Sequence, residues 1–180
     1  MLRRLVSANG VVVWQSPRLL QVGVPHGFST RRAAVNVQSD RSMDLSVAAD
    51  RARGLANRGR LMDAVGLADR TWHGARQVHG NAVIPVREED CPDADREADG
   101  LITRRPDAAI GILVADCAPI LLADVRGTIV SAVHAGWRGV VAGDVTRAVQ
   151  RMADDAAISP GDLVAAVGPC IGVNAFEVGS

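Results

Sequence analysis

Three short apolar runs in the second half of the sequence constrain the fold more than any other feature. They are Ile110–Ala115, Ile120–Ala123 and Thr128–Val133, and a turn at Asp124–Gly127 separates the second run from the third. Apolar runs of this length, bounded by turn residues, are typical of β-strands that are buried on both faces. Such strands occur mainly in sheets that helices cover. The sequence therefore predicts an α/β fold.

Weaker patterns elsewhere in the chain predict further strands and two helices. Additional strands are expected at Val11–Trp14, Leu19–Val24, Thr71–Val78, Asn81–Val86, Asp99–Thr103 and Leu163–Val167. Apolar residues with a helical period predict one helix from Ser46 to a stop at Gly66, and a second helix from Val140 onward. The second helix is expected to bury a face formed by Val141, Val145, Ala148, Val149 and Met152.

The composition narrows the class of protein. With 180 residues, 48% of them hydrophobic, the chain can bury a core and is too apolar to be disordered, and we interpret residues 1–180 as a single domain. Twenty basic residues balance twenty acidic ones, so the charge indicates no nucleic-acid or membrane-surface partner. No segment approaches the ~20 apolar residues of a membrane-spanning helix. Three cysteines without framework spacing favour a reducing compartment, and hence the cytoplasm.

Cysteine and histidine stand close to the apolar runs. Cys117 and His134 follow two of these runs, and α/β sheets place functional side chains at strand ends. With His79 they make a suitable ligand set for Zn²⁺, which would keep its fourth position for water or substrate and lower the pKa of that water to about 7. Spacing alone leaves two other interpretations open. Cys117 could be a nucleophile that His134 activates, or simply a small buried hydrophobic residue.

Two charged residues near these candidates suggest supporting roles. Arg138 lies in the Gly-rich bend Ala135–Gly139, where the following helix would direct its positive end toward the bend. An arginine there would suit a phosphate or a carboxylate. Asp116 precedes Cys117 and is a candidate for orienting a ligand or handling a proton, with a capping role as the alternative.

Five segments of the chain carry a more specific signal when they are taken together. They are Gln77–Gly80, Ala98–Thr103, Ala115–Leu121, Ala132–Gly139 and Val167–Gly172. In this order they resemble the motifs of the YfiH family, which is also known as the laccase-domain or peptidoglycan-editing-factor family. The H-A-G-W-R-G and A-D-C motifs are the most specific ones. The resemblance extends over residues 25–178.

The resemblance implies an α/β fold, with a mixed sheet flanked by helices, that is related to a bacterial toxin deamidase using Cys and His. It also implies a zinc-type site, with copper as the other candidate metal, at His79, Cys117 and His134. Activities ascribed to the family are phosphorolysis of adenosine, inosine and methylthioadenosine, adenosine deamination, polyphenol oxidation and editing of peptidoglycan precursors. The oxidase activity fits poorly, because copper oxidase chemistry needs further His/Cys clusters.

Our first hypothesis is therefore a zinc-dependent purine nucleoside phosphorylase with adenosine deaminase activity, whose substrates are a nucleoside and phosphate. In this hypothesis Arg138 holds the phosphate, and Arg31 or Arg32 assists. The second is a Cys–His amide hydrolase that acts on a cell-wall precursor. The third is an inactive, truncated domain that binds without catalysing.

The chain departs from the family pattern in two places. Arg32–Asn36 stands where the family has R-x-G-G-V-S, and Ser42–Leu45 stands where it has S-L-N-L, so the loop on the substrate side is expected to differ. Family members also continue well past the last matching segment. The chain is therefore expected to lack the family's C-terminal segment.

Overall fold

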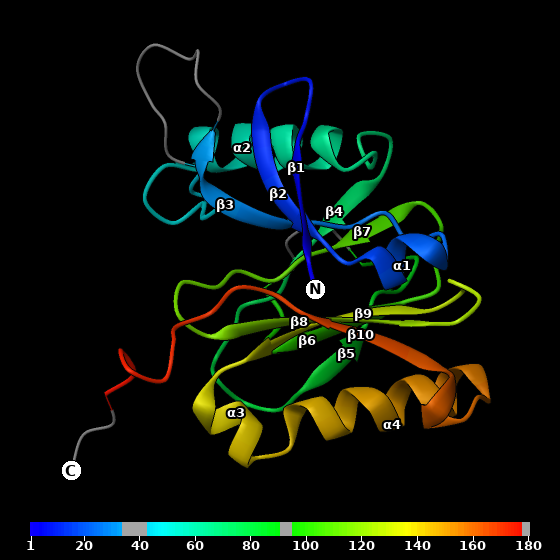
Figure 1. The fold of residues 1–180 in the computed structure, drawn as a ribbon. Helices are drawn as coiled ribbons and strands as arrows, with labels where there is room; N and C mark the ends of the chain where they lie inside the picture. The colour runs from blue at the N-terminus through cyan, green and yellow to red at the C-terminus, as the bar shows by residue number, and fades with distance from the viewer. Residues whose placement is uncertain (34–42, 91–94, 178–180) are drawn as a thin grey trace. The chain divides into compact units, whose positions relative to one another are not determined.

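A computed structural model describes residues 1–33, 43–90 and 95–177 of the chain. These residues form two compact units, Met1–Thr71 and Trp72–Ser180, and each unit combines its own sheet with helices (Figure 1). The predicted α/β class with a mixed sheet flanked by helices is confirmed. Within the described ranges, no helix has the length and apolar character needed to cross a membrane.

The first unit contains a three-stranded antiparallel sheet. Its strands are β1 (Arg3–Val6), β2 (Val11–Gln15) and β3 (Phe28–Ala33), with β2 in the centre. Val11 and Val13 of β2 are fully buried and belong to one core cluster with Leu61. This strand was predicted, whereas β1 has too few apolar residues to be recognised from the sequence.

Helix α1 (Pro17–Gln21) occupies much of the segment that was predicted as a strand at Leu19–Val24. Ser16 caps the helix, since its side chain accepts a hydrogen bond from the backbone N–H of Leu19, and proline occupies the first turn. Serine followed by proline is a typical helix start. The strand prediction at Leu19–Val24 was wrong because it relied on the apolar residues and gave too little weight to the helix-start signal of Ser16 and Pro17.

The predicted helix of the first unit is present as α2 (Arg51–Ala64), and it begins later than Ser46. Asp50 is its N-cap and accepts a hydrogen bond from the N–H of Arg53 at 3.0 Å. Gly66 follows the helix in the left-handed conformation, with φ at 77°, as expected for the residue after a C-cap.

The second unit contains a five-stranded mixed sheet with the order β10-β8-β9-β6-β5. Its strands are β5 (Val83–Pro85), β6 (Gly100–Thr103), β8 (Ala118–Asp124), β9 (Val130–Ala135) and β10 (Leu163–Val167). Only β5 and β6 are parallel, and the other neighbours are antiparallel. A separate small sheet pairs β4 (Thr71–His73) with β7 (Ala108–Ile110).

Three strand predictions in this unit were only partly right. Of the predicted strands Thr71–Val78 and Asn81–Val86, only β4 and β5 are present, and they pair with β7 and β6. Only the first residue of the run Ile110–Ala115 lies in a strand, and residues 111–117 have no regular structure. The cause lies at Leu113, whose backbone N–H and C=O bond to the side chain of Gln77 instead of a neighbouring strand.

The helix expected from Val140 is divided into α3 (Trp137–Val141) and α4 (Asp144–Ala156). Gly143 separates them in the left-handed conformation, with φ at 80°. Ala148 and Met152 are fully buried, as predicted for the apolar face, whereas Val141 is 81% exposed because it precedes the break.

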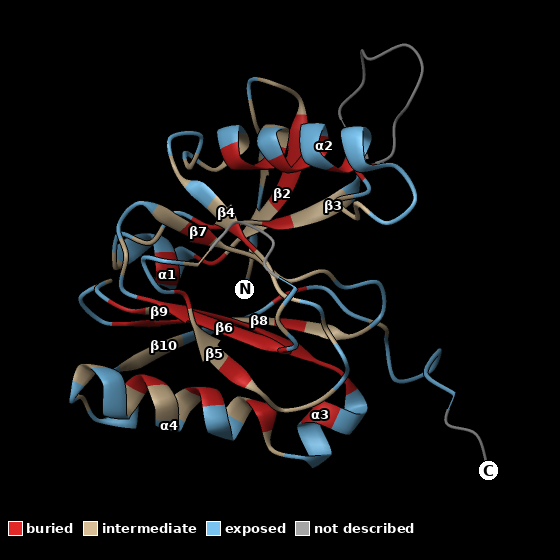
Figure 2. Ribbon diagram, turned by 180° about the vertical axis from the view of Figure 1, so that it is seen from behind, coloured by how far each residue is buried: buried red, intermediate tan, exposed pale blue. Residues whose placement is uncertain are grey.

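Helix α4 covers one face of the five-stranded sheet, and buried residues line both sides of this contact (Figures 1 and 2). The core consists of the buried residues Val83, Ile102, Leu122, Ile129, Val133, Ala148 and Met152. The turn between β8 and β9 is fixed by Asp124, whose buried carboxylate accepts hydrogen bonds from Thr128 and Ile129. This packing makes the β8–β9 hairpin a firm support for residues at its open end.

Candidate metal centre

The open end of the β8–β9 hairpin brings two of the candidate ligands together. Ala118 lies opposite Ala135, and Pro119 lies opposite His134 in the antiparallel register. Cys117 directly precedes β8, so it lies at the same end of the hairpin as His134 near the end of β9. The expectation that both residues follow their strands was wrong, because Cys117 precedes β8 and His134 lies within β9, although the two residues do meet.

The third candidate, His79, comes from the segment between β4 and β5. One ligand atom each of His79, Cys117 and His134 lie within 4.8 Å of one another. The two imidazole rings are 4.8 Å apart between centroids and meet edge to face at 76°. His134 is buried, Cys117 is half-buried and His79 is exposed, so the group opens to solvent on the side of His79.

Neither His73 nor Cys170 belongs to this group, as far as the described residues show. His73 is buried on β4, and the thiol of Cys170 follows β10 at an exposed position. The structure thus brings together three of the His and Cys residues that the sequence offers and separates these two from them.

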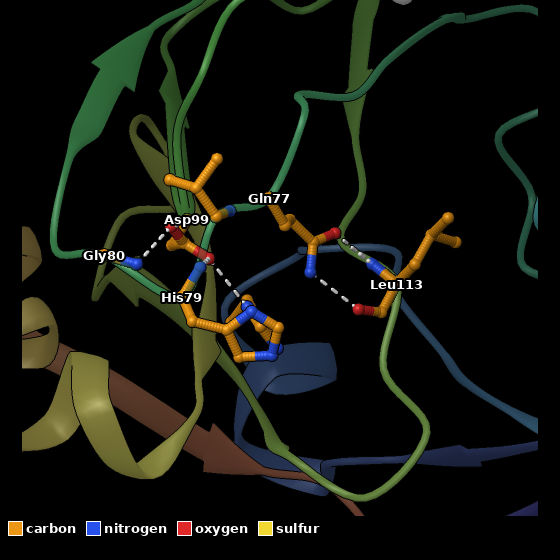
Figure 3. A network of polar contacts seen from close by, with 7 residues as sticks. Gln77, His79, Gly80, Asp99 and Leu113 are labelled. Atoms are coloured by element: carbon orange, nitrogen blue, oxygen red, sulfur yellow. Dashed lines mark hydrogen bonds and ion pairs between the residues drawn. The ribbon is translucent and has the colours of Figure 1, made fainter.

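A buried carboxylate, Asp99, organises the two imidazoles (Figure 3). One of its oxygens accepts hydrogen bonds from Nδ1–H of His134 at 2.8 Å and from the backbone N–H of His79 at 2.9 Å. The other oxygen accepts from the N–H of Val78 at 3.2 Å and of Gly80 at 2.7 Å. With its proton on Nδ1, His134 keeps the lone pair of Nε2 for a ligand, as is usual for metal-binding histidines.

These contacts also determine the charge of Asp99. Burial alone would raise its pKa, but the hydrogen bonds from His134, Gly80, Val78 and His79 outweigh burial and hold the pKa below the ordinary value. Asp99 is therefore ionised at neutral pH. The sequence analysis missed this residue, although an aspartate directly before a buried strand, within the A-D-G motif, was a usable signal.

The backbone of His79 is held in an unusual conformation. Its φ of 59° lies in the left-handed region, which a residue with a β-carbon rarely adopts. Three successive N–H groups, of Val78, His79 and Gly80, converge on the Asp99 carboxylate and stabilise this conformation. Strained backbone of this kind occurs preferentially at functional sites.

A side chain at either of two glycines of the H-A-G-W-R-G motif would crowd its neighbours, severely at Gly139 and more mildly at Gly136. A β-carbon on Gly136 would lie 3.1 Å from Sγ of Cys117 and 3.2 Å from Cδ2 of His79. A β-carbon on Gly139 would lie 2.5 Å from Oδ2 of Asp144 and 2.8 Å from the carbonyl oxygen of Gly80. The motif therefore allows α3 to approach the site closely.

Asp144 is a second buried carboxyl group behind the site. It is 1% exposed, and its Oδ2 has no hydrogen-bond partner among the residues that the structure describes. Burial raises the pKa of Asp144, and the charge of Asp99 adds to this effect, while a hydrogen bond from Val145 and the nearby His134 oppose it. Asp144 therefore contrasts with Asp99, which hydrogen bonds keep ionised.

The thiol of Cys117 has a raised pKa in the absence of a metal. The main cause is burial, and the negative charges of Asp116 and Asp99 add to it. Asp116 itself is exposed, and its backbone oxygen accepts a hydrogen bond from the N–H of Ile171 at 2.9 Å. A bound cation would reverse this balance, because it favours the thiolate directly.

The candidate anion-binding arginines lie in different units. Arg138 is exposed on α3, with its guanidinium 4.8 Å from the ring centroid of Trp137, which is itself 52% exposed. Such exposure is not that of a core residue. Arg31 is exposed on β3 of the first unit, and the side chain of Arg32 lies outside the described part.

Comparisons with known proteins identify the family. A family model described as "Multi-copper polyphenol oxidoreductase laccase" matches residues 25–180. Over 175 residues the chain is 35% identical to the purine nucleoside phosphorylase of Deinococcus radiodurans, covering 97% of the chain and 66% of that relative. Over 125 residues it is 40% identical to the purine nucleoside phosphorylase YfiH of Shigella flexneri, covering 69% of the chain and 48% of that relative.

A solved structure supports the same assignment. YlmD from Geobacillus stearothermophilus matches with a TM-score of 0.77 and 25% identity, covering 94% of this chain and 65% of that one. The chain spans less than two thirds of the length of each of these three relatives. Fold, motifs and family model agree, and the chain belongs to the YfiH, or laccase-domain, family.

Proposed function

We propose that this chain is a zinc-dependent purine nucleoside phosphorylase with adenosine deaminase activity, acting on adenosine, inosine and methylthioadenosine in the cytoplasm. The observation that supports it most is the convergence of His79, Cys117 and His134 beside an ionised, buried carboxylate. The relatives named purine nucleoside phosphorylase, at 35% and 40% identity, support the reaction class. Copper remains the second candidate metal.

The residues fit a zinc ion in three respects. Two imidazoles and one thiol are typical zinc ligands, and three protein ligands leave a position for substrate or water, as in catalytic sites. Asp99 fixes the tautomer of His134, so that Nε2 is free to bind. Gly136 leaves the space beside Cys117 and His79 without a side chain. When bound there, zinc would supply Lewis-acid polarisation at neutral pH.

The chain's own residues would bind phosphate, handle a proton and orient His134. Arg138, exposed on α3, would bind phosphate through charge-assisted hydrogen bonds. The assisting role of Arg31 or Arg32 stays a prediction from the sequence. Asp116 would handle a proton beside Cys117. Asp99 would keep its charge throughout and hold the proton on Nδ1 of His134.

A multi-copper oxidase is less compatible with the site. Such enzymes need several clusters of His and Cys ligands. Within the described residues, a single group of three such side chains lies close enough together to hold an ion.

The test is a phosphorolysis assay with adenosine, inosine and methylthioadenosine, read as release of the free base, on chain loaded with zinc. We expect base release that depends on phosphate, ammonia release from adenosine, and loss of both after chelation. Arg138→Ala is expected to raise the KM for phosphate at least about tenfold, since charge-assisted bonds contribute more than neutral ones. A zinc-loaded, folded chain without either activity would contradict the proposal.

A second candidate function is a Cys–His amide hydrolase that acts on a cell-wall precursor. One observation favours it. Cys117 lies close to His134, and His134 bonds to Asp99, so a nucleophile, a base and an orienting carboxylate stand in sequence. The raised pKa of Cys117 argues against it, because a raised pKa leaves less of the thiol in the nucleophilic thiolate form. Chelation separates the two functions, since it abolishes the first and spares the second, whereas thiol alkylation blocks both.

A further inference from the structure

Cys117 lies at the end of a segment that the sheet does not hold. Residues 111–117 connect β7 to β8 without regular structure. At one end of this segment, the N–H of Gly111 donates to the carbonyl of His73 at 3.0 Å. At the other end, the carbonyl of Asp116 accepts from the N–H of Ile171 at 2.9 Å. The middle of the segment needs a different support.

The side chain of Gln77 supplies that support (Figure 3). Its Nε2 donates to the carbonyl of Leu113, and its Oε1 accepts from the N–H of Leu113, both at 2.7 Å. The amide thus pairs with both backbone groups of one residue, as a neighbouring strand would. Gln77 and Leu113 are both partly buried, so neither bond is fully exposed to competing water.

Gln77 belongs to the same short segment as His79. The backbone of residues 78–80 is fixed on Asp99, which also holds His134. The side chain of Gln77 extends from this segment to the strand-free segment of Cys117. One stretch of four residues therefore connects the supports of both imidazoles to the support of the thiol.

We propose that Gln77 is a positioning residue that sets the distance of the Cys117 thiol from the two imidazoles, and so determines the affinity for zinc. The proposal rests on the metal site of the proposed function. Gln77 does not itself touch the metal or the substrate in this proposal. Its two hydrogen bonds limit the conformations of residues 111–117 before the metal arrives, which lowers the entropic cost of binding.

The test compares Gln77→Met with Gln15→Met. Methionine keeps the length of glutamine and removes both hydrogen bonds to Leu113. Gln15 is a matched control, because its Nε2 also donates to a backbone carbonyl, that of His26 at 2.8 Å, but lies in the first unit. We expect the zinc Kd to rise at least about tenfold in Gln77→Met, as for other outer partners of metal ligands, and to stay within about twofold in Gln15→Met.

A second measurement tests the positioning role without any metal. In the metal-free protein, alkylation by iodoacetamide is followed at each cysteine by peptide mass spectrometry, with Cys170 as the internal reference. Iodoacetamide should alkylate Cys117 several-fold faster in Gln77→Met than in the unsubstituted chain, because residues 111–117 sample more open conformations. The alkylation rate of Cys170 should be the same in both proteins. Cobalt substitution gives a third readout, since weaker thiolate-to-cobalt absorption is expected in this variant.

The outcomes separate the proposal from its alternatives. A folded Gln77→Met protein with unchanged zinc affinity and unchanged Cys117 alkylation would overturn it. If Gln77→Met does not fold, Gln77→Glu decides, since a carboxylate can accept from Leu113 N–H and cannot donate to the carbonyl; unchanged zinc affinity in that variant overturns the proposal. If the unsubstituted chain binds no zinc, the proposed function fails, and the alkylation rates alone decide the role of Gln77.

Discussion

His134 and Cys117 are neighbours at one end of the same hairpin, yet the protein holds them in different ways. His134 lies within β9, is 3% exposed and bonds to the ionised Asp99. Cys117 lies just outside β8, on a segment that depends on the side chain of Gln77. On the imidazole side of the site, His134 is thus built into the sheet, and the exposed His79 is fixed to it through Asp99. The thiol side relies on its junction with β8 and on a few local bonds.

The comparison suggests a division of roles. A ligand fixed by the core sets where a metal binds, and a ligand on a less constrained segment can adjust to the metal or to the substrate. Substitutions on the imidazole side should therefore reduce folding stability and metal affinity together. Substitutions on the thiol side should reduce metal affinity and leave folding stability nearly unchanged.

The largest effect is expected for Asp99→Ala. It leaves the N–H groups of Val78, His79 and Gly80 and the Nδ1–H of His134 without their acceptor. Removing one partner of such a buried charged network should lower the free energy of unfolding by about 3–5 kcal/mol. The zinc Kd should rise about 10–100-fold. Urea unfolding and zinc titration provide the two measurements.

Asp124→Ala is the matched control for this change. Asp124 is also buried and also accepts several hydrogen bonds, but it lies at the closed end of the β8–β9 hairpin, opposite the end that carries Cys117 and His134. The Asp124→Ala variant should lose about as much folding stability as Asp99→Ala and keep the zinc affinity of the unsubstituted protein. Equal losses of zinc affinity in both variants would mean that Asp99 acts on the metal site only through general stability.

A smaller effect is expected for Gly136→Ala, which crowds both the thiol of Cys117 and the imidazole of His79. The added β-carbon would lie 3.1 Å from Sγ of Cys117 and 3.2 Å from Cδ2 of His79, so these side chains must shift by a few tenths of an ångström. The zinc Kd should rise about tenfold, since displaced ligands lose part of their binding energy. Gly59→Ala on α2 is the control, because no described residue outside the helix's own nearby backbone would lie within 4 Å of the added β-carbon, and it should raise stability by about 0.5–1 kcal/mol. Unchanged zinc affinity in Gly136→Ala would show that the two ligands adjust freely.

Asp144→Asn tests the carboxyl group behind the imidazole side through pH. The folded-state pKa of Asp144 is raised above the ordinary value of 3.8 by burial. Its contribution to stability is therefore fully present below that value and is lost as the pH rises through the folded-state pKa. Asparagine carries no charge, so the variant should lose less stability between pH 4 and pH 7, as measured by thermal unfolding across this range. If Asp144→Asn and the unsubstituted protein showed the same pH dependence of stability, ionisation of Asp144 would not destabilise the fold.

The smallest effect is expected for Asp116→Asn. The exposed carboxylate raises the pKa of the Cys117 thiol, but it contributes less than burial does. Removing its charge should lower the pKa of the thiol and speed alkylation of Cys117 in the metal-free protein near pH 8. Folding stability should not change. The proton-handling role proposed for Asp116 also predicts lower catalytic activity at unchanged zinc affinity, and unchanged activity would contradict that role.

The sequence predicted the strands and the ligand types better than the connections between them. The apolar runs at Ile120–Ala123 and Leu163–Val167 form strands, because exposing such apolar runs to water is unfavourable and a sheet buries them. The run Ile110–Ala115 looked the same and is mostly irregular. Its outcome depends on Gln77, more than 30 residues away in the sequence, and no local pattern contains such a contact.

The same limit applies to the site. The types of His79, Cys117 and His134 indicated metal chemistry, and motif resemblance selected the same three residues. Asp99 was missed because its importance comes from four hydrogen bonds that exist only in the folded chain. The sequence predicted a supporting role for Asp116 instead, because it is adjacent to Cys117, although its side chain is exposed.

The most direct test of the account is the zinc content of the purified chain, measured by elemental analysis beside Cys117→Ser and Cys170→Ser. Both variants remove one thiol, but only Cys117 lies with the two imidazoles. We predict one zinc per chain in the unsubstituted protein and in Cys170→Ser, and little or none in Cys117→Ser. Unchanged zinc in Cys117→Ser would contradict the proposed ligand set.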